Sequence, residues 1–462
     1  MENLLITYEE GCGKMLKTTK YQGKNVLVMG LARSGMAAAR ILRELGANVT
    51  INDGRAYKDN DDAKVMEAEG FKVITGGHPV ELLDSGFELI VKNPGIPYKR
   101  TPLLLVAQER NIPIVCEVEI AYAISEAPFI GVTATNGKTT TVTLIHEIMQ
   151  ADGIKSKLAG NIGVVSSLVA KDAKADEVLV TELSSFQLMG ICDFRPYIGL
   201  ILNITEAHLD YHTNLGEYRQ AKLNLVKKQL TSDFFVYNAD DEFITSQLWQ
   251  TQAMVVPFSQ KKKVAGAYLL EGELFYQDEK IINVCDILLK GEHNLQDVLG
   301  AVAVCKLYGA THAAISTVLR RFTGVAHRLQ FVKDVKGVKY YNNSKATNVI
   351  ATKSALQAFK EPTILLAGGL DRDHDLEPLA EDLRTVRAIF AFGQSQQRFW
   401  ELAQKHEVHC ETFDGLEMAF EAAVGIAREG DVVLLAPACA SWDQYVDFEA
   451  RGNAFIELVE KL

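Results

Sequence analysis

The stretch from Gly131 to Thr140 constrains the fold more than any other part of the chain. It reads Gly-Val-Thr-Ala-Thr-Asn-Gly-Lys-Thr-Thr and lies between an apolar run and a helix-like segment. A loop of this kind wraps backbone N–H groups around the phosphates of a nucleoside triphosphate, and the helix N-terminus adds its positive dipole end. We therefore predict a nucleotide-binding α/β domain, with Lys138 on the β- and γ-phosphates and the Thr139 hydroxyl on Mg²⁺.

One position of this loop departs from the expected pattern. Ala134 stands where a shorter variant of the loop has Gly. A methyl group is harmful there if the backbone needs a positive φ or a close approach. We expect the substitution to be tolerated. The competing interpretation is a chance Gly-Lys-Thr in a Thr-rich turn.

Strand-like runs alternate with helix-length segments along almost the whole chain, which is typical of parallel sheets covered by helices. A length of 462 residues allows roughly three domains. We predict an α/β protein with a Rossmann-like domain at 1–118, a central P-loop ATPase-type domain at 119–323 and a C-terminal Rossmann-like α/β domain at 324–462.

The composition excludes several classes of protein. A net charge of -11 argues against general nucleic-acid or membrane-surface binding, because both need a basic face. No apolar run approaches the roughly 18 residues of a membrane span, and Glu9 and Glu10 do not fit a signal peptide. Seven unpatterned cysteines indicate reduced thiols. We expect a cytoplasmic protein without nucleic-acid or membrane partners, and a monomer.

The first domain begins like a dinucleotide-binding unit. An apolar run at 25–29 leads into a Gly turn at 30–35, and a second run ends in Asp53 about twenty residues on. A nicotinamide cofactor is one interpretation. Because Ala32 takes a Gly position, binding of another nucleotide, or of none, is at least as plausible.

Polar side chains at strand ends mark the chemistry of the central domain. Glu182 closes an apolar strand, where a carboxylate is well placed to hold Mg²⁺. Asn203, Glu206, His208 and Asp210 cluster past the next strand, which favours a site. Lys222 follows at the start of a helix that we place from Tyr218; by itself this lysine suggests a solvated surface.

Further candidates lie toward the C-terminus. Asn294 opens an Ala- and Val-rich helix and either caps it or faces a base. Arg328 could reach a phosphate. The loop at 342–348 contains Lys345 and Thr347, which a simple turn does not explain. Ser441 follows the last strong strand, at the edge where open α/β sheets bind ligands.

Taken together, these motifs resemble the Mur ligase family, the ATP-dependent amide ligases that build the peptidoglycan peptide. The resemblance covers nearly the whole chain in the expected order. It implies addition of D-glutamate to UDP-N-acetylmuramoyl-L-alanine, since the Asp-Asn-Pro-Arg signature of the diamino-acid-adding relatives is absent. The discriminating stretches are 30–35, 92–97, 343–348, 368–372 and 437–441.

The resemblance also implies roles for individual residues. The UDP-sugar would contact Arg33, Ser34, Asp53, Gly95 and Asn161. ATP would contact Thr135, Asn136, Gly137, Lys138, Thr139, Thr140, Asn294, Arg328, Asn343 and Lys345. D-glutamate would contact Thr347, Arg372, Ser441 and Phe448.

The implied chemistry needs ATP and two Mg²⁺ sites. The metal ligands would be Thr139, Glu182, His208 and Lys222, with Lys222 carbamylated by CO₂, and Lys138, Glu182, His208 and Lys222 would be catalytic. The L-alanyl carboxylate would attack the γ-phosphate and form an acyl phosphate, which the amine of D-glutamate then attacks. The metal ions and Lys138 would neutralise the developing charge.

Three alternatives stay open at this point. Another ligase of the family would add a different amino acid. A regulator that binds nucleotide without turnover is suggested by Ala134 and by Asn343, which stands where the family commonly has Asp. We expect Asn343 still to hydrogen-bond the nucleotide or a water. A nicotinamide dehydrogenase is disfavoured, because no catalytic His or Lys pairing accompanies the Gly turn.

Overall fold

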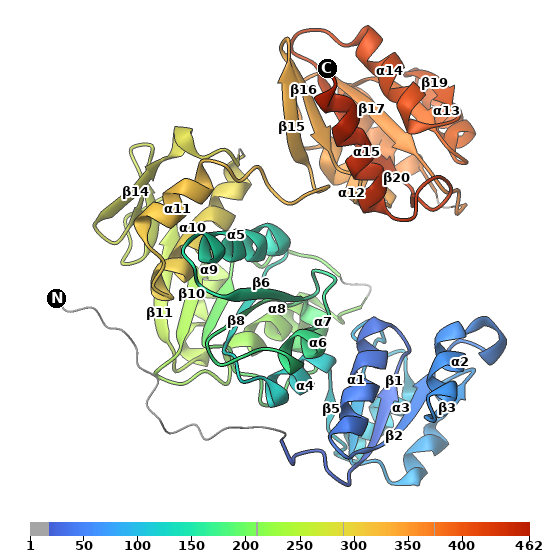
Figure 1. The fold of residues 1–462 in the computed structure, drawn as a ribbon, viewed down its shortest axis with the longest axis vertical. Coiled ribbons are helices and arrows are strands. Elements are labelled where there is room, and N and C mark those ends of the chain that lie inside the picture. Colours follow the sequence, from blue (N-terminus) through green and yellow to red (C-terminus); the bar gives the residue numbers. More distant parts are fainter. Residues whose placement is uncertain (1–17, 209–210, 290, 374) are drawn as a thin grey trace. The chain divides into compact units, whose positions relative to one another are not determined.

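The computed structural model describes residues 18–208, 211–289, 291–373 and 375–462. The chain divides into two compact units, Met1–Phe322 and Thr323–Leu462. Three separate sheets carry the architecture, two in the first unit and one in the second (Figure 1). The predicted α/β class is confirmed. None of the helices in the described ranges is long and apolar enough to cross a membrane.

The first sheet forms the N-terminal domain. Its five strands are all parallel, in the order β3-β2-β1-β4-β5. One core packs α1, α2 and part of α4 (Glu117–Ile124) against the sheet, and a second core packs α3. The strands are β1 (Asn25–Met29), β2 (Asn48–Asp53), β3 (Lys72–Thr75), β4 (Leu89–Lys92) and β5 (Ile114–Val115), and the helices α1 (Arg33–Glu44), α2 (Asp61–Ala68) and α3 (Pro102–Glu109).

The second sheet has nine strands in the order β14-β13-β12-β11-β10-β9-β6-β8-β7. Successive residues of β6 point to opposite faces, so Phe129 packs in one core and Ile130 in the other. Helices α5, α10 and α11 cover one face, and α4, α6, α7, α8 and α9 cover the other. The strands through β11 are β6 (Phe129–Thr133), β7 (Ser156–Gly160), β8 (Val178–Glu182), β9 (Ile198–Ile201), β10 (Phe234–Asn238) and β11 (Met254–Ser259).

The helices of this sheet follow the chain order. They are α4 (Glu117–Ile124), α5 (Lys138–Ala151), α6 (Ser166–Lys171), α7 (Ser185–Leu188), α8 (Leu215–Leu223), α9 (Glu242–Ser246), α10 (Glu292–Leu307) and α11 (His312–Leu319). Helix α8 begins three residues before the predicted start at Tyr218, because the Asn214 side chain accepts the Glu217 N–H and caps it.

One end of the second sheet is antiparallel, which the strand–helix alternation did not predict. Strands β12 (Ala267–Leu270), β13 (Glu273–Tyr276) and β14 (Glu279–Asn283) form a meander. The two-residue turn Glu271–Gly272 has positive φ at both positions, 50° and 78°, which suits the twist of a tight hairpin. A two-residue connection leaves no room for a crossover helix, so these strands pair antiparallel.

The third sheet forms the second unit, in the order β15-β16-β20-β17-β18-β19. Helices α12 and α13 pack on one face, and α14 and α15 on the other. The strands are β15 (Gln330–Val335), β16 (Val338–Asn342), β17 (Thr363–Gly368), β18 (Val386–Phe392), β19 (His409–Phe413) and β20 (Val432–Ala438). The helices are α12 (Val349–Leu356), α13 (Gln396–Lys405), α14 (Leu416–Ile426) and α15 (Phe448–Glu460).

Short 3₁₀ helices complete the described secondary structure, at Tyr57–Asp59, Val80–Ser85, Asn224–Val226, Leu248–Gln250, Val284–Asp286 and Glu377–Thr385.

The strand order of the second sheet decides where the polar segments of the central domain meet. Strand β6 lies between β8 and β9 and is parallel to both. The segments that follow these three strands therefore emerge at one edge of the sheet, which is the usual ligand edge of an open α/β fold.

Candidate active site

The phosphate loop connects β6 to α5 and is held from the neighbouring strand. The Asn203 side-chain oxygen, just past β9, accepts the N–H groups of Thr135 at 3.1 Å and Asn136 at 3.0 Å. Gly137 has φ 90°, and a Cβ there would lie 2.0 Å from an oxygen of Asp297 in α10. Glycine is therefore required both for the turn and for space. Ala134 has no positive φ and is fully buried, so its methyl group is accommodated.

Two lysines converge on one carbonyl oxygen of this loop. Lys138 Nζ donates to Ala134 O at 2.8 Å and to Thr135 O at 2.9 Å. Lys222 Nζ, from α8, donates to the same Ala134 O at 2.7 Å. The Lys222 side chain has only 1% exposure. Burial, and then the charge of Lys138, lower the pKa of Lys222 well below its usual value, while Glu182 opposes this shift.

Glu182 ends β8, and its carboxylate connects the start of α5 to the segment that follows β7. Its side chain is 2% exposed. One carboxylate oxygen accepts the Thr139 hydroxyl at 2.7 Å, and the other accepts the Asn161 amide at 2.8 Å. Asn161 directly follows β7. The structure therefore brings Thr139, Glu182 and Asn161 together, and the hydroxyl and carboxylate oxygens are hard ligands that suit Mg²⁺.

His208 lies on the segment after β9 and is solvent-exposed. Its backbone has φ 55°, an uncommon conformation for a residue with a side chain. Its ring packs edge-on against Phe186 at 5.1 Å between centroids and lies 6.1 Å from Tyr218. Among the residues that the structure describes, no three or more His, Cys, Asp or Glu side chains are grouped to hold a metal ion. The metal role of His208 stays a prediction, and Asp210 of the same predicted cluster lies outside the described residues.

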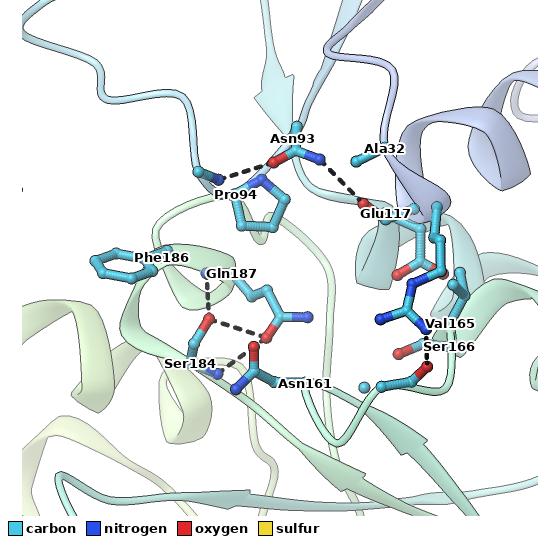
Figure 2. A pocket seen from close by; sticks show the side chains of 15 residues that line it. Ala32, Asn93, Pro94, Glu117, Asn161, Val165, Ser166, Ser184, Phe186 and Gln187 are labelled. Carbon is cyan, nitrogen blue, oxygen red and sulfur yellow. Dashed lines mark hydrogen bonds between the residues drawn. The ribbon is translucent and has the colours of Figure 1, made fainter. Parts of the chain in front are cut away.

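A pocket of about 340 Å³ lies between the N-terminal domain and the central domain, within the first unit. Figure 2 shows Asn93 and Pro94 on one side of it, and Phe186, Ser184 and Asn161 on another. Four of the five residues predicted to bind the UDP-sugar line it: Arg33, Ser34, Gly95 and Asn161. The remaining lining residues are Ala32, Asn93, Pro94, Glu117, Gly160, Gly163, Val165, Ser166, Ser184, Phe186 and Gln187.

Internal hydrogen bonds hold the N-terminal wall of this pocket. The Asn93 side chain donates to the Ser34 hydroxyl at 3.3 Å and accepts the Gly95 N–H at 2.9 Å. Arg33 donates across the pocket to Gly163 O at 3.2 Å. These contacts place predicted ligand residues from separate segments on one surface.

Asp53, the fifth predicted residue, is not among the residues that line the pocket. It is buried at the end of β2, where one oxygen accepts the Leu31 N–H at 2.6 Å. The other oxygen accepts from Arg55 and from the Asn60 side chain. In the structure Asp53 therefore holds the turn after β1, and a direct contact with the sugar nucleotide stays a prediction.

The residues predicted for ATP in the last part of the chain lie at the start of α10 and in the second unit. Asn294 lies in the first turn of α10 and its N–H donates to Gly291 O at 3.1 Å. Arg328 and Asn343 lie in the second unit. The Asn343 side-chain oxygen accepts the Leu329 N–H at 3.0 Å, so this amide orders the turn next to Arg328.

The residues predicted for D-glutamate lie past the carboxyl ends of β16, β17 and β20 or at the start of α15. Phe448 lies with its ring centroid 4.7 Å from the ammonium of Lys345, which is predicted for ATP. Arg372 lies 4.7 Å from the Trp442 ring centroid. The Ser441 hydroxyl is buried without a hydrogen-bond partner among the described residues. An unsatisfied buried hydroxyl is unusual and is available to a ligand.

Two supporting residues had no clear signal in the sequence. Asp297 packs under the phosphate loop, where burial raises the pKa of its carboxyl group well above the usual value, opposed by Lys138. Arg451, in α15, is fully buried and donates to the carbonyl oxygens of Ser344, Gly368 and Cys439. It ties the end of β17 to the segments that follow β16 and β20. Both read in the sequence as ordinary helix residues.

Comparison with known proteins supports the resemblance to the Mur ligase family over nearly the whole chain. Three family models match: the Mur ligase MurD-like N-terminal domain at residues 24–116, the Mur ligase middle domain at 132–305, and the Mur ligase glutamate ligase domain at 327–439. The UDP-N-acetylmuramoylalanine--D-glutamate ligase of Geobacillus sp. (strain WCH70) is 50% identical over 451 residues, covering 97% of this chain and 100% of that protein. The protein of the same name from Bacillus cereus (strain G9842) is 48% identical over 450 residues, with the same coverage.

Solved structures show the same fold at low sequence identity. The UDP-N-acetylmuramate-alanine ligase MurC of Thermotoga maritima aligns with a TM-score of 0.54 and 18% identity, over 95% of this chain and 99% of that chain. A UDP-N-acetylmuramoyl-L-alanyl-D-glutamate--2,6-diaminopimelate ligase aligns with a TM-score of 0.53 and 16% identity, over 96% and 94%. The family predicted from the sequence motifs is confirmed, and the chain belongs to the Mur ligase family.

Proposed function

We propose that this protein is the ATP-dependent ligase that adds D-glutamate to UDP-N-acetylmuramoyl-L-alanine, releasing ADP and phosphate, in peptidoglycan precursor synthesis. Near-complete coverage of relatives that carry this name supports the choice of substrates. The observation that carries the chemistry is the convergence of Lys138, Thr139, Glu182 and Lys222 at the carboxyl ends of β6 and β8.

The geometry supports division of the site into a phosphate end and a sugar end. Asn161 touches both, because it lines the pocket and donates to Glu182. A UDP-sugar in the pocket would therefore direct its L-alanyl carboxylate toward the residues around Glu182. The ATP phosphates would lie along the N–H groups of 135–140, with Lys138 turning from the loop carbonyls to the β- and γ-phosphates.

The first step would be attack of the L-alanyl carboxylate on the γ-phosphate, giving an acyl phosphate and ADP. The D-glutamate amine would then attack the acyl carbon, and phosphate would leave as the amide forms. Lys138 would balance the charge that builds up on the transferred phosphoryl group. Thr347, Arg372, Ser441 and Phe448 are the residues that we propose for D-glutamate.

Mg²⁺ fits part of the donor set. Thr139 and Glu182 offer oxygen ligands on adjacent segments, and bound Mg²⁺ would screen the phosphate charges during transfer. Lys222 as an ammonium repels a cation. Reaction of its neutral amine with CO₂, with loss of a proton, gives a carbamate whose oxygens suit a second Mg²⁺ together with His208. The lowered pKa of Lys222 favours the neutral amine that this reaction needs.

The test is phosphate release by the purified protein with ATP, Mg²⁺ and UDP-N-acetylmuramoyl-L-alanine. We expect release to require D-glutamate and not to be supported by L-glutamate. Turnover with a different amino acid would move the protein to another branch of the family. Nucleotide binding without any substrate-dependent release would support the regulator instead. Lys138→Ala serves as the inactive control.

A further inference from the structure

Lys92 is a buried cation that the proposed reaction does not use. It is the last residue of β4 and is 1% exposed. Its ammonium donates to the main-chain oxygens of Asn93 at 3.0 Å, Pro94 at 3.2 Å and Ile96 at 2.8 Å. All these oxygens are neutral. Burial lowers the pKa of Lys92, so a buried cation is kept here at a cost, which calls for a reason.

Tyr211 completes the set of oxygens around this ammonium from the other domain. Its hydroxyl lies 3.1 Å from Lys92 Nζ and within 3.0 Å of the oxygens of Pro94 and Ile96. The Lys92 ammonium also lies 4.9 Å from the Tyr98 ring centroid and 5.8 Å from that of Tyr211. Aromatic faces stabilise a desolvated cation at such distances.

The ring of Tyr211 connects this cluster to the opposite wall of the pocket. Its centroid lies 4.2 Å from that of Phe186, which lines the pocket from the central domain. Asn93, Pro94 and Gly95 line it from the N-terminal domain. Tyr211 therefore contacts both walls at once, with its hydroxyl on one and its ring on the other.

The peptide geometry explains how Lys92 acts on the pocket side of the loop. In a planar trans peptide the C=O and the next N–H point in opposite directions. When Lys92 draws in the Pro94 oxygen, the Gly95 N–H turns away from the ammonium. It donates to the Asn93 side chain, whose amide in turn donates to Ser34. Lys92 thus fixes the orientation of the polar groups that face the pocket.

We propose that Lys92 and Tyr211 are positioning residues that hold the two walls of this pocket in register for the sugar nucleotide. The pair touches no substrate itself. This inference rests on the proposed function in one respect, the identity of the ligand that occupies the pocket. It predicts an effect on binding of UDP-N-acetylmuramoyl-L-alanine and no effect on D-glutamate.

The first test is Lys92→Met, with Lys99→Met as the matched control because Lys99 is exposed in the same segment. Loss of hydrogen bonds from a charged donor weakens the coupled state by roughly tenfold or more. We expect the Kd of UDP-N-acetylmuramoyl-L-alanine from calorimetry, and its KM, to rise by about that factor. The KM for D-glutamate and the values for Lys99→Met stay at wild-type levels.

The second test is Tyr211→Phe, which keeps the ring on Phe186 and removes only the hydroxyl. Tyr57→Phe is its control, because it deletes a surface hydroxyl that bonds Glu67 in the N-terminal domain. We expect a selective rise in the Kd of the UDP-sugar of roughly threefold to tenfold. A merely structural role would lower the melting temperature and the active fraction and leave the Kd unchanged.

The outcomes separate this inference from the proposed function. Wild-type Kd values in a folded Lys92→Met protein would overturn it, as would a wild-type Kd in Tyr211→Phe. If Lys92→Met does not fold, Tyr211→Phe decides the matter. If the unmodified protein binds the UDP-sugar and both variants bind it equally well, the positioning role alone fails. If the unmodified protein does not bind it, both proposals fall.

Discussion

Asn203→Ala tests whether the phosphate loop is preorganised by its neighbouring strand. The side-chain oxygen of Asn203 accepts the N–H groups of Thr135 and Asn136, and its amide donates to Asn136 O at 3.2 Å. The Thr135 N–H keeps a second acceptor after the change, the main-chain oxygen of Asn203 at 3.0 Å. The loss therefore falls mainly on Asn136.

The magnitude follows from these contacts. Two hydrogen bonds to Asn136 are lost, and each contributes about 0.5 to 1.5 kcal/mol, so the ordered loop is weakened by about 1 to 3 kcal/mol. Because Asn136 is exposed, water partly replaces the lost hydrogen bonds, which favours the lower half of the range. At about 1.4 kcal/mol per factor of ten, the KM for ATP should rise by roughly fivefold to thirtyfold.

The assay is phosphate release at saturating UDP-sugar and D-glutamate with varied ATP. Asn203→Asp is the matched variant, because a carboxylate still accepts both N–H groups but places a negative charge beside the phosphates. It loses the amide donor to Asn136 O and should raise the KM for ATP through repulsion with the phosphates, an effect that added salt reduces. An ATP KM within about twofold of wild type in Asn203→Ala, a change below about 0.5 kcal/mol, would refute the reasoning.

Three further predictions concern Ala134, Asn343 and Lys222. Ala134→Gly should leave kcat within about twofold and lower stability by about 1 kcal/mol, through lost methyl burial and added chain entropy; a tenfold gain in kcat would mean that the loop is impaired. Asn343→Asp keeps the acceptor for the Leu329 N–H, so ATP KM and kcat should change by less than about threefold; a large gain would show that Asn343 is damaging. Protein supplied with ¹³C-bicarbonate should give a carbamate NMR signal that is absent in Lys222→Arg. Because the pKa of Lys222 is lowered, that signal should grow as pH rises and persist to lower pH than for a surface lysine.

Much of the fold was accessible from local patterns. The runs of apolar residues at 25–29, 178–182 and 432–436 are strands in the structure, and the segment from Lys138 is a helix. A buried parallel strand is apolar on both faces, so it stands out in the sequence. The antiparallel meander β12–β14 was missed. Its strands are short, and the prediction assumed that strands alternate with helices, whereas two-residue turns connect these strands.

The candidate site also contains residues that a local motif points to and residues that no motif points to. Residues with a distinctive motif, such as Thr139 and Asn161, could be named from the sequence, and the structure places both on the carboxylate of Glu182. Their roles stay predictions. Asp297 and Arg451 act beneath the site and were missed, because a buried charge in a helix has no local signature. Lys92 is a similar case, since nothing in the stretch 92–97 shows that its ammonium is enclosed.

Local motifs were enough to identify the family and to name the side chains that we propose for its chemistry, because phosphate loops and strand-end carboxylates depend on residues that are close in the chain. Which groups share a partner depends on the three-dimensional arrangement. Lys138 and Lys222 meet on one carbonyl oxygen although 84 positions separate them (222 minus 138), and Tyr211 meets Lys92 across two domains. Strand order and the packing of the two domains set these meetings, and both depend on contacts between distant segments that no local pattern records.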